Sequence, residues 1–183
     1  LIPFFKKSTD QSTQLDVVSI PVQPGLICLR GLSPERTRFE LEYALERGST
    51  DNSFLFFDSD TSENASKDVV LVHPPGDIYG DVFLPALAKV LPKATAKLKV
   101  IVGHVNPNRV ELLRRLASIY PFMELISSNP GAKLIKDLWI QSRPPVSQKE
   151  ERAQESSPSL PPVRVIRQEE LLLTCFSHQL RLL

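Results

Sequence analysis

Acidic residues and a histidine follow two neighbouring apolar runs near the middle of the sequence. The run FLFF leads into Asp58 and Asp60, and the run DVVLV leads into His73 and Asp77. Two carboxylates at positions i and i+2 of an extended chain point to the same side, so they can bind one Mg²⁺ or Mn²⁺ ion together. A histidine at the end of a strand can serve as a general base. These residue types predict a ligand or metal site at two strand ends, or turns and helix starts that the acids cap.

The elements around these residues alternate between strand and helix patterns from residue 15 to residue 142, which is typical of an α/β domain with a mostly parallel sheet. We expect strands at 25–31, 53–60, 68–75, 97–105 and 121–128, and helices at 33–48, 81–94 and 108–120. The connection NPG favours a further strand at 132–142 that pairs antiparallel with 121–128. His73 and His104 would then lie at the ligand-binding edge of the sheet.

The rest of the chain divides into three segments by composition. Residues 1–14 are expected to be flexible, and residues 143–162 are rich in Pro, Ser, Glu and Gln, which predicts a disordered linker. In residues 163–183 apolar side chains recur at helical spacing, which predicts an amphipathic tail helix. This helix could pack on its own domain, and we expect it to bind a protein partner. The chain begins with Leu1 rather than Met, as a fragment or a processed product would.

The composition is that of a globular chain without a strong electrostatic preference. Of the 183 residues 42% are hydrophobic, and 22 Lys and Arg against 21 Asp and Glu give a net charge of +1. This balance gives no broad electrostatic case for nucleic acid or for an anionic membrane. Cys28 and Cys175 lie far apart and indicate neither a zinc site nor a disulfide framework. We therefore expect an intracellular location, cytoplasmic or nuclear, and no membrane partner.

The order of elements resembles the class I S-adenosylmethionine-dependent methyltransferases. The resemblance rests on a strand GLICLRG, a strand SFLFF followed by an acid, and the loop HPPG after a third strand. It implies a Rossmann-like three-layer sandwich with a mostly parallel sheet and a C-terminal antiparallel strand pair. It also implies cofactor-binding roles, and the residues that would take them are Gly31, Asp58, His73, Pro74 and Pro75. The catalytic candidates are His73 and Asp77.

The chain departs from this family at the places where the chemistry would occur. The first loop, LRGLSPE, has one glycine where the family has several, and His73 stands where an amide or an acid is usual. Gly76 stands where the family has an aromatic residue. We therefore expect a degenerate, non-catalytic binding or assembly module, with residual binding of S-adenosylmethionine or a nucleotide.

Three alternative resemblances lead to other functions. FLFFDSDT resembles the Asp-x-Asp sequence of GT-A glycosyltransferases, which implies a glycosyl- or phosphoryl-transfer enzyme with Mg²⁺ or Mn²⁺ on Asp58 and Asp60. DSDTS together with GDIYGD resembles the motifs of haloacid-dehalogenase-type phosphatases, but only 15 residues separate Asp60 from Gly76. LICLRGLSPERTRFELEYAL resembles the first strand and helix of an RNA-recognition motif. RNA binding is not favoured, because the partner strand with its stacking aromatics is missing.

Overall fold

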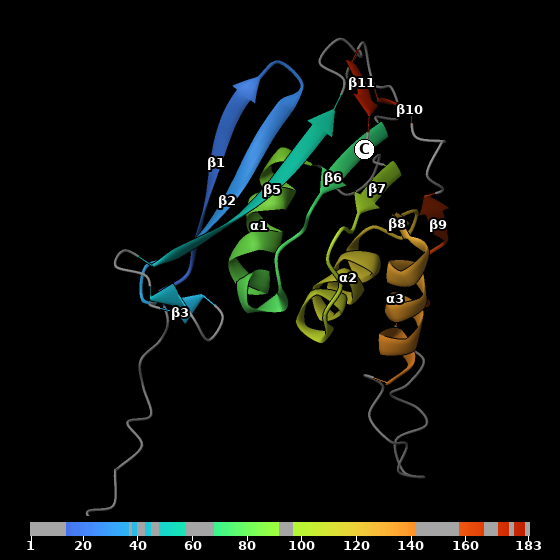
Figure 1. Cartoon of the computed structure of the whole chain (residues 1–183). Coiled ribbons are helices and arrows are strands. Elements are labelled where there is room, and N and C mark those ends of the chain that lie inside the picture. Colours follow the sequence, from blue (N-terminus) through green and yellow to red (C-terminus); the bar gives the residue numbers. More distant parts are fainter. Residues whose placement is uncertain are drawn as a thin grey trace, which may run out of the picture.

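A seven-stranded mixed sheet forms the centre of the computed structural model, with strand order β1-β2-β5-β6-β7-β8-β9 (Figure 1). The structure describes residues 14–36, 38–39, 43–44, 48–57, 68–91, 97–141, 158–166, 172–175 and 178–181. The sheet strands are β1 (Asp16–Gln23), β2 (Leu26–Ser33), β5 (Ser49–Phe57), β6 (Asp68–Val72), β7 (Lys97–Ile101), β8 (Glu124–Ser128) and β9 (Val163–Ile166). Two separate hairpins pair β3 (Arg38–Phe39) with β4 (Tyr43–Ala44) and β10 (Leu172–Cys175) with β11 (His178–Arg181).

The sheet has an antiparallel half and a parallel half. Neighbouring strands from β1 to β6 run antiparallel, and neighbouring strands from β6 to β9 run parallel. β1 and β2 are joined by a tight turn at Gly25, whose φ of 75° suits a residue without a side chain. The parallel strands need crossovers, which the 3₁₀ turn η1 (Asp77–Tyr79) with α1 (Gly80–Val90), α2 (Pro107–Ile119) and α3 (Asn129–Gln141) provide.

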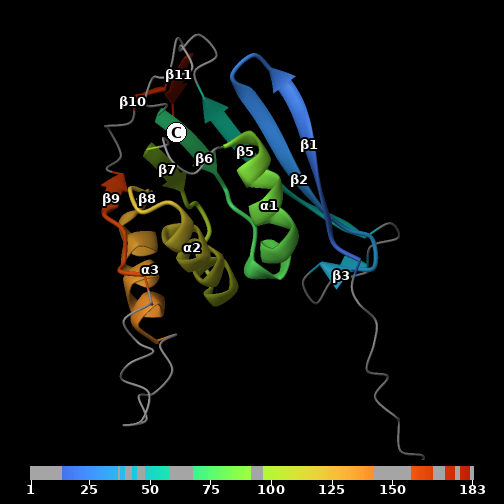
Figure 2. The ribbon, with the colours of Figure 1, turned by 180° about the vertical axis from the view of Figure 1, so that it is seen from behind.

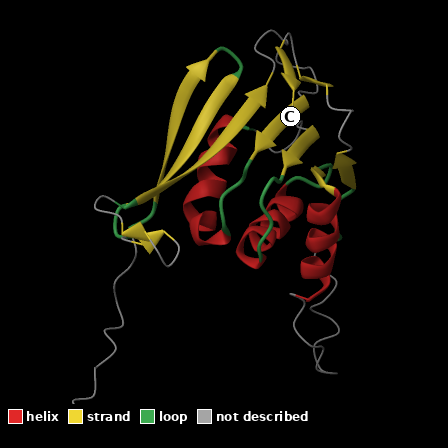
Figure 3. Ribbon diagram, viewed as in Figure 1, coloured by secondary structure: helices red, strands yellow, loops and turns green. Residues whose placement is uncertain are grey.

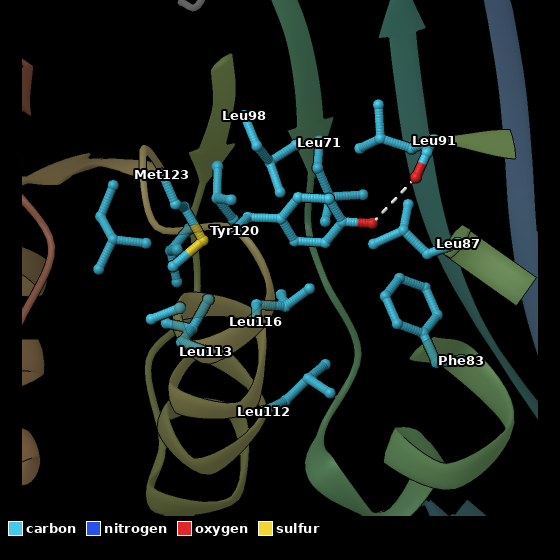
Figure 4. Close-up of a cluster of buried hydrophobic side chains, with 14 of the residues drawn as sticks. Leu71, Phe83, Leu87, Leu91, Leu98, Leu112, Leu113, Leu116, Tyr120 and Met123 are labelled. Carbon is cyan, nitrogen blue, oxygen red and sulfur yellow. Dashed lines mark hydrogen bonds between the residues drawn. The ribbon is translucent and has the colours of Figure 1, made fainter. Parts of the chain in front are cut away.

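The three α-helices lie together on one side of the sheet (Figures 2 and 3). Alternate residues of the central strands face them, which builds one continuous apolar core from strands and helices. In Figure 4 the side chains of α1 and α2 meet those of β6 and β7, and the Tyr120 hydroxyl donates a 3.1 Å hydrogen bond to the Leu91 carbonyl oxygen. This hydrogen bond gives the buried phenol a partner, which avoids the free-energy cost of an unsatisfied hydroxyl group in the core.

Arg114 and Trp139 join α2, α3 and the strand that follows them. The Arg114 guanidinium donates to the carbonyl oxygens of Leu138 and Trp139 and lies 5.2 Å from the centre of the Trp139 ring. Helix carbonyls at a C-terminus have no intrahelical partner, and a cation there is favourable. The Trp139 indole N–H in turn donates a 3.4 Å hydrogen bond to the carbonyl oxygen of Pro158. The end of α3 and the approach to β9 are therefore held at one place.

The α/β class is confirmed, together with most of the predicted strands and helices. Strands lie within 25–31, 53–60, 68–75, 97–105 and 121–128 as expected, and helices within 81–94 and 108–120. The methyltransferase topology is wrong, because the antiparallel strands are at the N-terminal end of the sheet and the last pairs are parallel. In the described ranges the helices cover one face only, so two layers are present there rather than three.

Three predicted elements are wrong. The helix expected at 33–48 is replaced by a connection with the short hairpin β3–β4, because Ser33 pairs with Ser49 and the chain must return beside itself. The strand expected at 132–142 is helix α3, because Ala132, Ile135 and Trp139 are buried at helical spacing. The tail expected to be helical contains the strands β9, β10 and β11. Residues 1–13 and 142–157, which include most of the predicted flexible segments, lie outside the described residues.

None of the helices in the described ranges combines the length and the apolar character that crossing a bilayer requires.

Candidate functional site

Polar side chains gather where the amino end of β5 meets the carboxyl ends of β6 and β7. The positions of β5 that face the helices are polar at one end, Ser49, Asp51 and Ser53, and apolar at the other, Leu55 and Phe57. Because β5 runs antiparallel to β6, its polar end reaches the point where β6 has ended. This pattern leaves a group of polar residues at the edge of an otherwise apolar layer. We call the polar end of β5, together with the residues that follow β6 and β7, the polar corner.

Arg109 fills this corner. Its side chain is 7% exposed, and its Nε and NH1 atoms donate hydrogen bonds of 2.6 and 2.7 Å to the carbonyl oxygens of Pro74 and His104. Its NH2 atom lies 3.4 Å from His73 Nε2 and 3.9 Å from Asp51 Oδ2. Burial lowers the pKa of Arg109 and Asp51 raises it, but a guanidinium stays protonated in either case. A permanent cation therefore connects β5 with the loops after β6 and β7.

The start of α2 fixes the position of Arg109. Asn106 has an extended backbone, and its side-chain oxygen accepts a 2.8 Å hydrogen bond from the Arg109 backbone N–H. Asn is among the preferred residues for this capping position, and the following Pro107 suits the first helical residue. Arg109 lies next to Val110 on the buried side of the helix. The helix therefore presents a charged side chain to the core at its first turn.

His73 has a left-handed backbone conformation with φ of 57°, which only a few per cent of non-glycine residues adopt. Its backbone N–H donates to the Ile101 carbonyl oxygen at 3.0 Å, and its carbonyl oxygen accepts from Ser53 Oγ at 2.8 Å. Burial lowers the pKa of His73 most, and the positive charge of Arg109 lowers it further, against the opposite effect of Asp51. A neutral ring can accept from the Arg109 guanidinium, and a protonated ring cannot.

The lowered pKa of His73 predicts that the protein loses stability in mild acid. Below about pH 6.5, the ordinary pKa of a histidine, the unfolded chain gains a proton that the folded His73 ring resists, so the unfolded state is favoured progressively as the pH falls. We expect the urea midpoint to drop between about pH 7.5 and 5.5. The variant His73→Asn tolerates the left-handed backbone and does not titrate, so it should show a smaller drop. An equal drop in both proteins would contradict the assignment of this pH dependence to His73.

Gly31 supports the same corner by its close packing against Tyr79. It pairs with Asp51 across β2 and β5, and a Cβ atom on Gly31 would lie 2.9 Å from the Tyr79 ring. The Tyr79 ring is buried against the strand, and its hydroxyl lies near Ser33 and Ser49 but outside hydrogen-bond geometry. Burial raises the pKa of Tyr79, and Asp51 raises it further. A neutral phenol next to Asp51 is therefore favoured.

Asp77 and Asp81 form ion pairs with Arg115 on the outside of the corner. Arg115 NH1 lies 3.0 Å from Asp77 Oδ1, and NH2 lies 2.7 Å from Asp81 Oδ1. These pairs raise the pKa of Arg115 and join the start of α1 to α2. Asp81 lies in the first turn of α1, where an acid is favourable, and the N-cap position of this helix is occupied by Tyr79.

The structure brings some of the predicted site residues together and leaves others outside. His73 lies in the corner, Pro74 and Pro75 are buried beside it, and Asp77 is in the Arg115 ion pair. Asp58 and Asp60, the predicted metal pair, lie outside the described residues. No finding tests a catalytic role for His73 or Asp77, and that role stays a prediction.

Two residues central to the corner were not predicted from the sequence. Arg109 shares the buried side of α2 with apolar residues such as Leu113 and Leu116, and a charged residue in an apolar stripe was the signal available for it. Asp51 alternates with Ser49 and Ser53 along β5, and this polar alternation before FLFF was the signal for the second.

Comparison with known proteins identifies relatives of the chain. No protein-family model matches it. It is 38% identical over 122 residues to diflavin flavoprotein A 6 of Nostoc sp. strain PCC 7120, a match that covers 67% of this chain and 20% of that protein. The chain thus spans about a fifth of the length of the curated relatives that it matches.

Solved structures with the same fold come from similar proteins. A metal-soaked Flv1 flavodiiron core from Synechocystis sp. PCC6803 matches with a TM-score of 0.62 and 30% identity, over 83% of this chain and 32% of that chain. A fragment, residues 1–254, of diflavin flavoprotein A 5 from Nostoc sp. PCC 7120 matches with a TM-score of 0.64 and 25% identity, over 85% of this chain and 52% of that fragment.

These comparisons correct the functional predictions. The degenerate methyltransferase, the metal-dependent glycosyl- or phosphoryl-transfer enzyme and the RNA-binding module are wrong, because the relatives are diflavin and flavodiiron proteins. S-adenosylmethionine and Mg²⁺ or Mn²⁺ are wrong as cofactors for the same reason. The chain is therefore similar, over most of its described fold, to one part of the diflavin flavoproteins.

Proposed function

We propose that the chain is a segment of a diflavin or flavodiiron redox protein. In this segment the Arg109 guanidinium takes the place between Asp51 and His73 that a metal ion would need in order to bind there. The relationship is supported by 38% identity over 122 residues and by the shared fold. The activity and the flavin binding that the names of the relatives imply are proposed for the longer protein to which this segment would belong. An intracellular location is proposed with it.

The residues of the corner do not fit the iron that the word flavodiiron implies. Iron in proteins is bound by histidine, carboxylate or thiolate ligands. Within the described ranges no three His, Cys, Asp or Glu side chains come together as a metal-binding group. The His73 ring and the Asp51 carboxylate are instead within 4 Å of the Arg109 guanidinium. A second cation at this place would be repelled by the first.

Arg109 instead cross-links separate segments of the chain, as a bound metal ion would. It links two backbone carbonyl oxygens, one carboxylate and one imidazole that belong to three segments far apart in the sequence. A guanidinium offers five N–H donors in a fixed plane, which suits this bridging position. The single observation that carries the proposal is this buried guanidinium between Asp51 and His73. We propose that it keeps the corner folded without a metal.

The proposal is tested by metal binding to the purified chain and to the variant Arg109→His. The unchanged protein should hold no stoichiometric iron and should not bind Co²⁺ tightly. Arg109→His removes the cation and adds an imidazole beside Asp51 and His73, so it should gain about one equivalent of Co²⁺ with a ligand-field absorption band.

The matched control is Arg164→His on the exposed side of β9, which should gain none. Stoichiometric iron in the unchanged protein that is lost on Asp51→Asn would overturn the proposal.

A further inference from the structure

Three hydroxyl groups come together between the sheet and the 3₁₀ turn η1. Ser33 and Ser49 are direct partners across β2 and β5, so their side chains lie on the same face of the sheet. The hydroxyl of Tyr79 in η1 lies near both serines. Ser33 is 2% exposed and Tyr79 is 1% exposed, so the group is enclosed by protein. We call these three residues the hydroxyl cluster.

The packing of the Tyr79 ring fixes where its hydroxyl lies. A Cβ atom on Gly31 would lie 3.3 Å from Tyr79 Cζ, the ring carbon that carries the hydroxyl. Gly31 and Ser33 are two residues apart in β2 and share a face of the strand. The Tyr79 backbone N–H also donates a 3.1 Å hydrogen bond to the Gly76 carbonyl oxygen. The hydroxyl therefore cannot move far without lifting the ring off the strand.

Two members of the hydroxyl cluster need a hydrogen-bond partner. Tyr79 Oη and Ser49 Oγ are buried, and neither has a partner among the residues that the structure describes. The other buried phenol, that of Tyr120, donates to the Leu91 carbonyl oxygen. Buried hydroxyls without a partner are rare in native proteins, and an ordered water molecule commonly supplies one. The hydroxyl cluster therefore has the composition of a site for a small polar molecule.

The charges around the hydroxyl cluster favour a neutral molecule over an ion. Burial raises the pKa of Tyr79 most, Asp51 raises it further, and Arg36 lowers it. A carboxylate and a guanidinium therefore both act on the hydroxyl. Asp51 would repel an anion, and Arg36 would repel a cation. The Arg109 guanidinium, 3.9 Å from Asp51 Oδ2, adds a second positive charge against a cation.

We propose that the hydroxyl cluster binds one ordered water molecule, which bridges Tyr79 Oη and Ser49 Oγ. A water molecule donates two hydrogen bonds and accepts two, and a buried one typically makes about three with otherwise unsatisfied groups. Such a bridge would join η1 to β5 beside the polar corner. The inference rests on Tyr79 and the two serines, so it holds or fails independently of the role proposed for Arg109.

The first test is a crystal structure of the 183-residue chain in which ordered waters are visible. We expect an electron-density peak within about 3.2 Å of both Tyr79 Oη and Ser49 Oγ. A direct hydrogen bond from Tyr79 Oη to a serine, without such a peak, would overturn the proposal. A peak surrounded by about six oxygen atoms at about 2.3–2.6 Å would also overturn it, because those distances indicate a metal cation.

The second test counts long-lived buried waters in solution by magnetic relaxation dispersion of the water signal. Ser33→Val together with Ser49→Val replaces both hydroxyls by methyl groups, which suit strands and fill the proposed site. The number of long-lived waters should fall by about one per molecule. The matched control is Thr50→Val, which makes the same kind of change at the neighbouring, exposed position of β5 and should leave the number unchanged. An unchanged number in the double variant would overturn the proposal.

A milder variant keeps the test valid if the two valines prevent folding. Tyr79→Phe removes only the phenol oxygen and leaves the ring packed on Gly31. The water would lose one of its hydrogen bonds, so its residence time should shorten at least about threefold. The same residence time in Tyr79→Phe and in the unchanged protein would show that no long-lived water is bound to the phenol.

Discussion

Replacing Arg109 with alanine should lower the free energy of unfolding by about 3–5 kcal/mol, because one partner of a buried ion pair is lost. The carbonyl oxygens of Pro74 and His104 would lose their donors, and Asp51 would lose the guanidinium that lies 3.9 Å from its Oδ2 atom. Each buried acceptor left without a partner costs about 1–3 kcal/mol. Urea denaturation monitored by Trp139 fluorescence measures the change.

Two comparison variants separate the charge of Arg109 from its shape. Arg109→Lys keeps the charge, but the lysine side chain cannot reach all four partners. It should therefore lower the free energy of unfolding, but by less than Arg109→Ala does. Arg115→Ala removes a guanidinium whose ion pairs with Asp77 and Asp81 are on the surface, and it should cost at most about 1 kcal/mol. A loss for Arg109→Ala no larger than that for Arg115→Ala would show that the corner does not depend on this residue.

Replacing Gly31 with valine should cost about 2–3 kcal/mol, the usual penalty for overfilling a packed core. The added Cβ would lie 2.9 and 3.1 Å from two carbon atoms of the Tyr79 ring. Tyr79 is 1% exposed and belongs to η1, so its ring cannot move into solvent without shifting the start of α1. Valine is otherwise well suited to a strand, so the clash is the only reason for a loss.

A double-mutant cycle identifies Tyr79 as the cause. Tyr79→Ala alone should cost about 3–5 kcal/mol through the cavity it leaves. Combined with Gly31→Val, the total should fall clearly short of the sum, because valine then fills part of that cavity. Strictly additive losses would mean that Gly31 is needed for some other reason, such as a ligand that approaches its backbone.

The strands β6, β7 and β8 and the two helices between them could be predicted from the sequence because their signals are local. DVVLV and KLKVI are short apolar runs bounded by polar residues, and the helix after KLKVI begins with ordinary signals, Asn106 and Pro107. The order of these elements is shared by many α/β proteins, so it resembled a methyltransferase without indicating one. Fold class does not determine function.

The antiparallel half was harder to predict because its pairing is not local. The stretch 33–48 has a helical pattern of apolar residues, but the pairing of Ser33 with Ser49 makes it a connection between two strands. Gly48, with φ of 77°, allows that return. Strand β1 was missed because most of its side chains are exposed, and its alternation is weak. Tertiary pairing outweighs local propensity in both cases.

The position of two histidines after neighbouring strands could be predicted from the sequence, but the residues that surround them could not. The histidines at the ends of β6 and β7 lie where a parallel sheet puts its ligand edge, as the sequence indicated. Arg109 could not be assigned from the sequence, because its partners are two backbone carbonyls and side chains from positions 51 and 73. Such partners become neighbours only in the folded sheet.

The hydrogen bond from the Trp139 indole to Pro158 limits which insertions the protein can accept. The chain leaves α3 just after this ring and comes back to it at Pro158, so the exit and the re-entry of residues 142–157 are fastened together. Any variant that changes the length of the chain between these two points should therefore keep both Trp139 and Pro158, because their hydrogen bond fixes the distance between the end of α3 and the approach to β9.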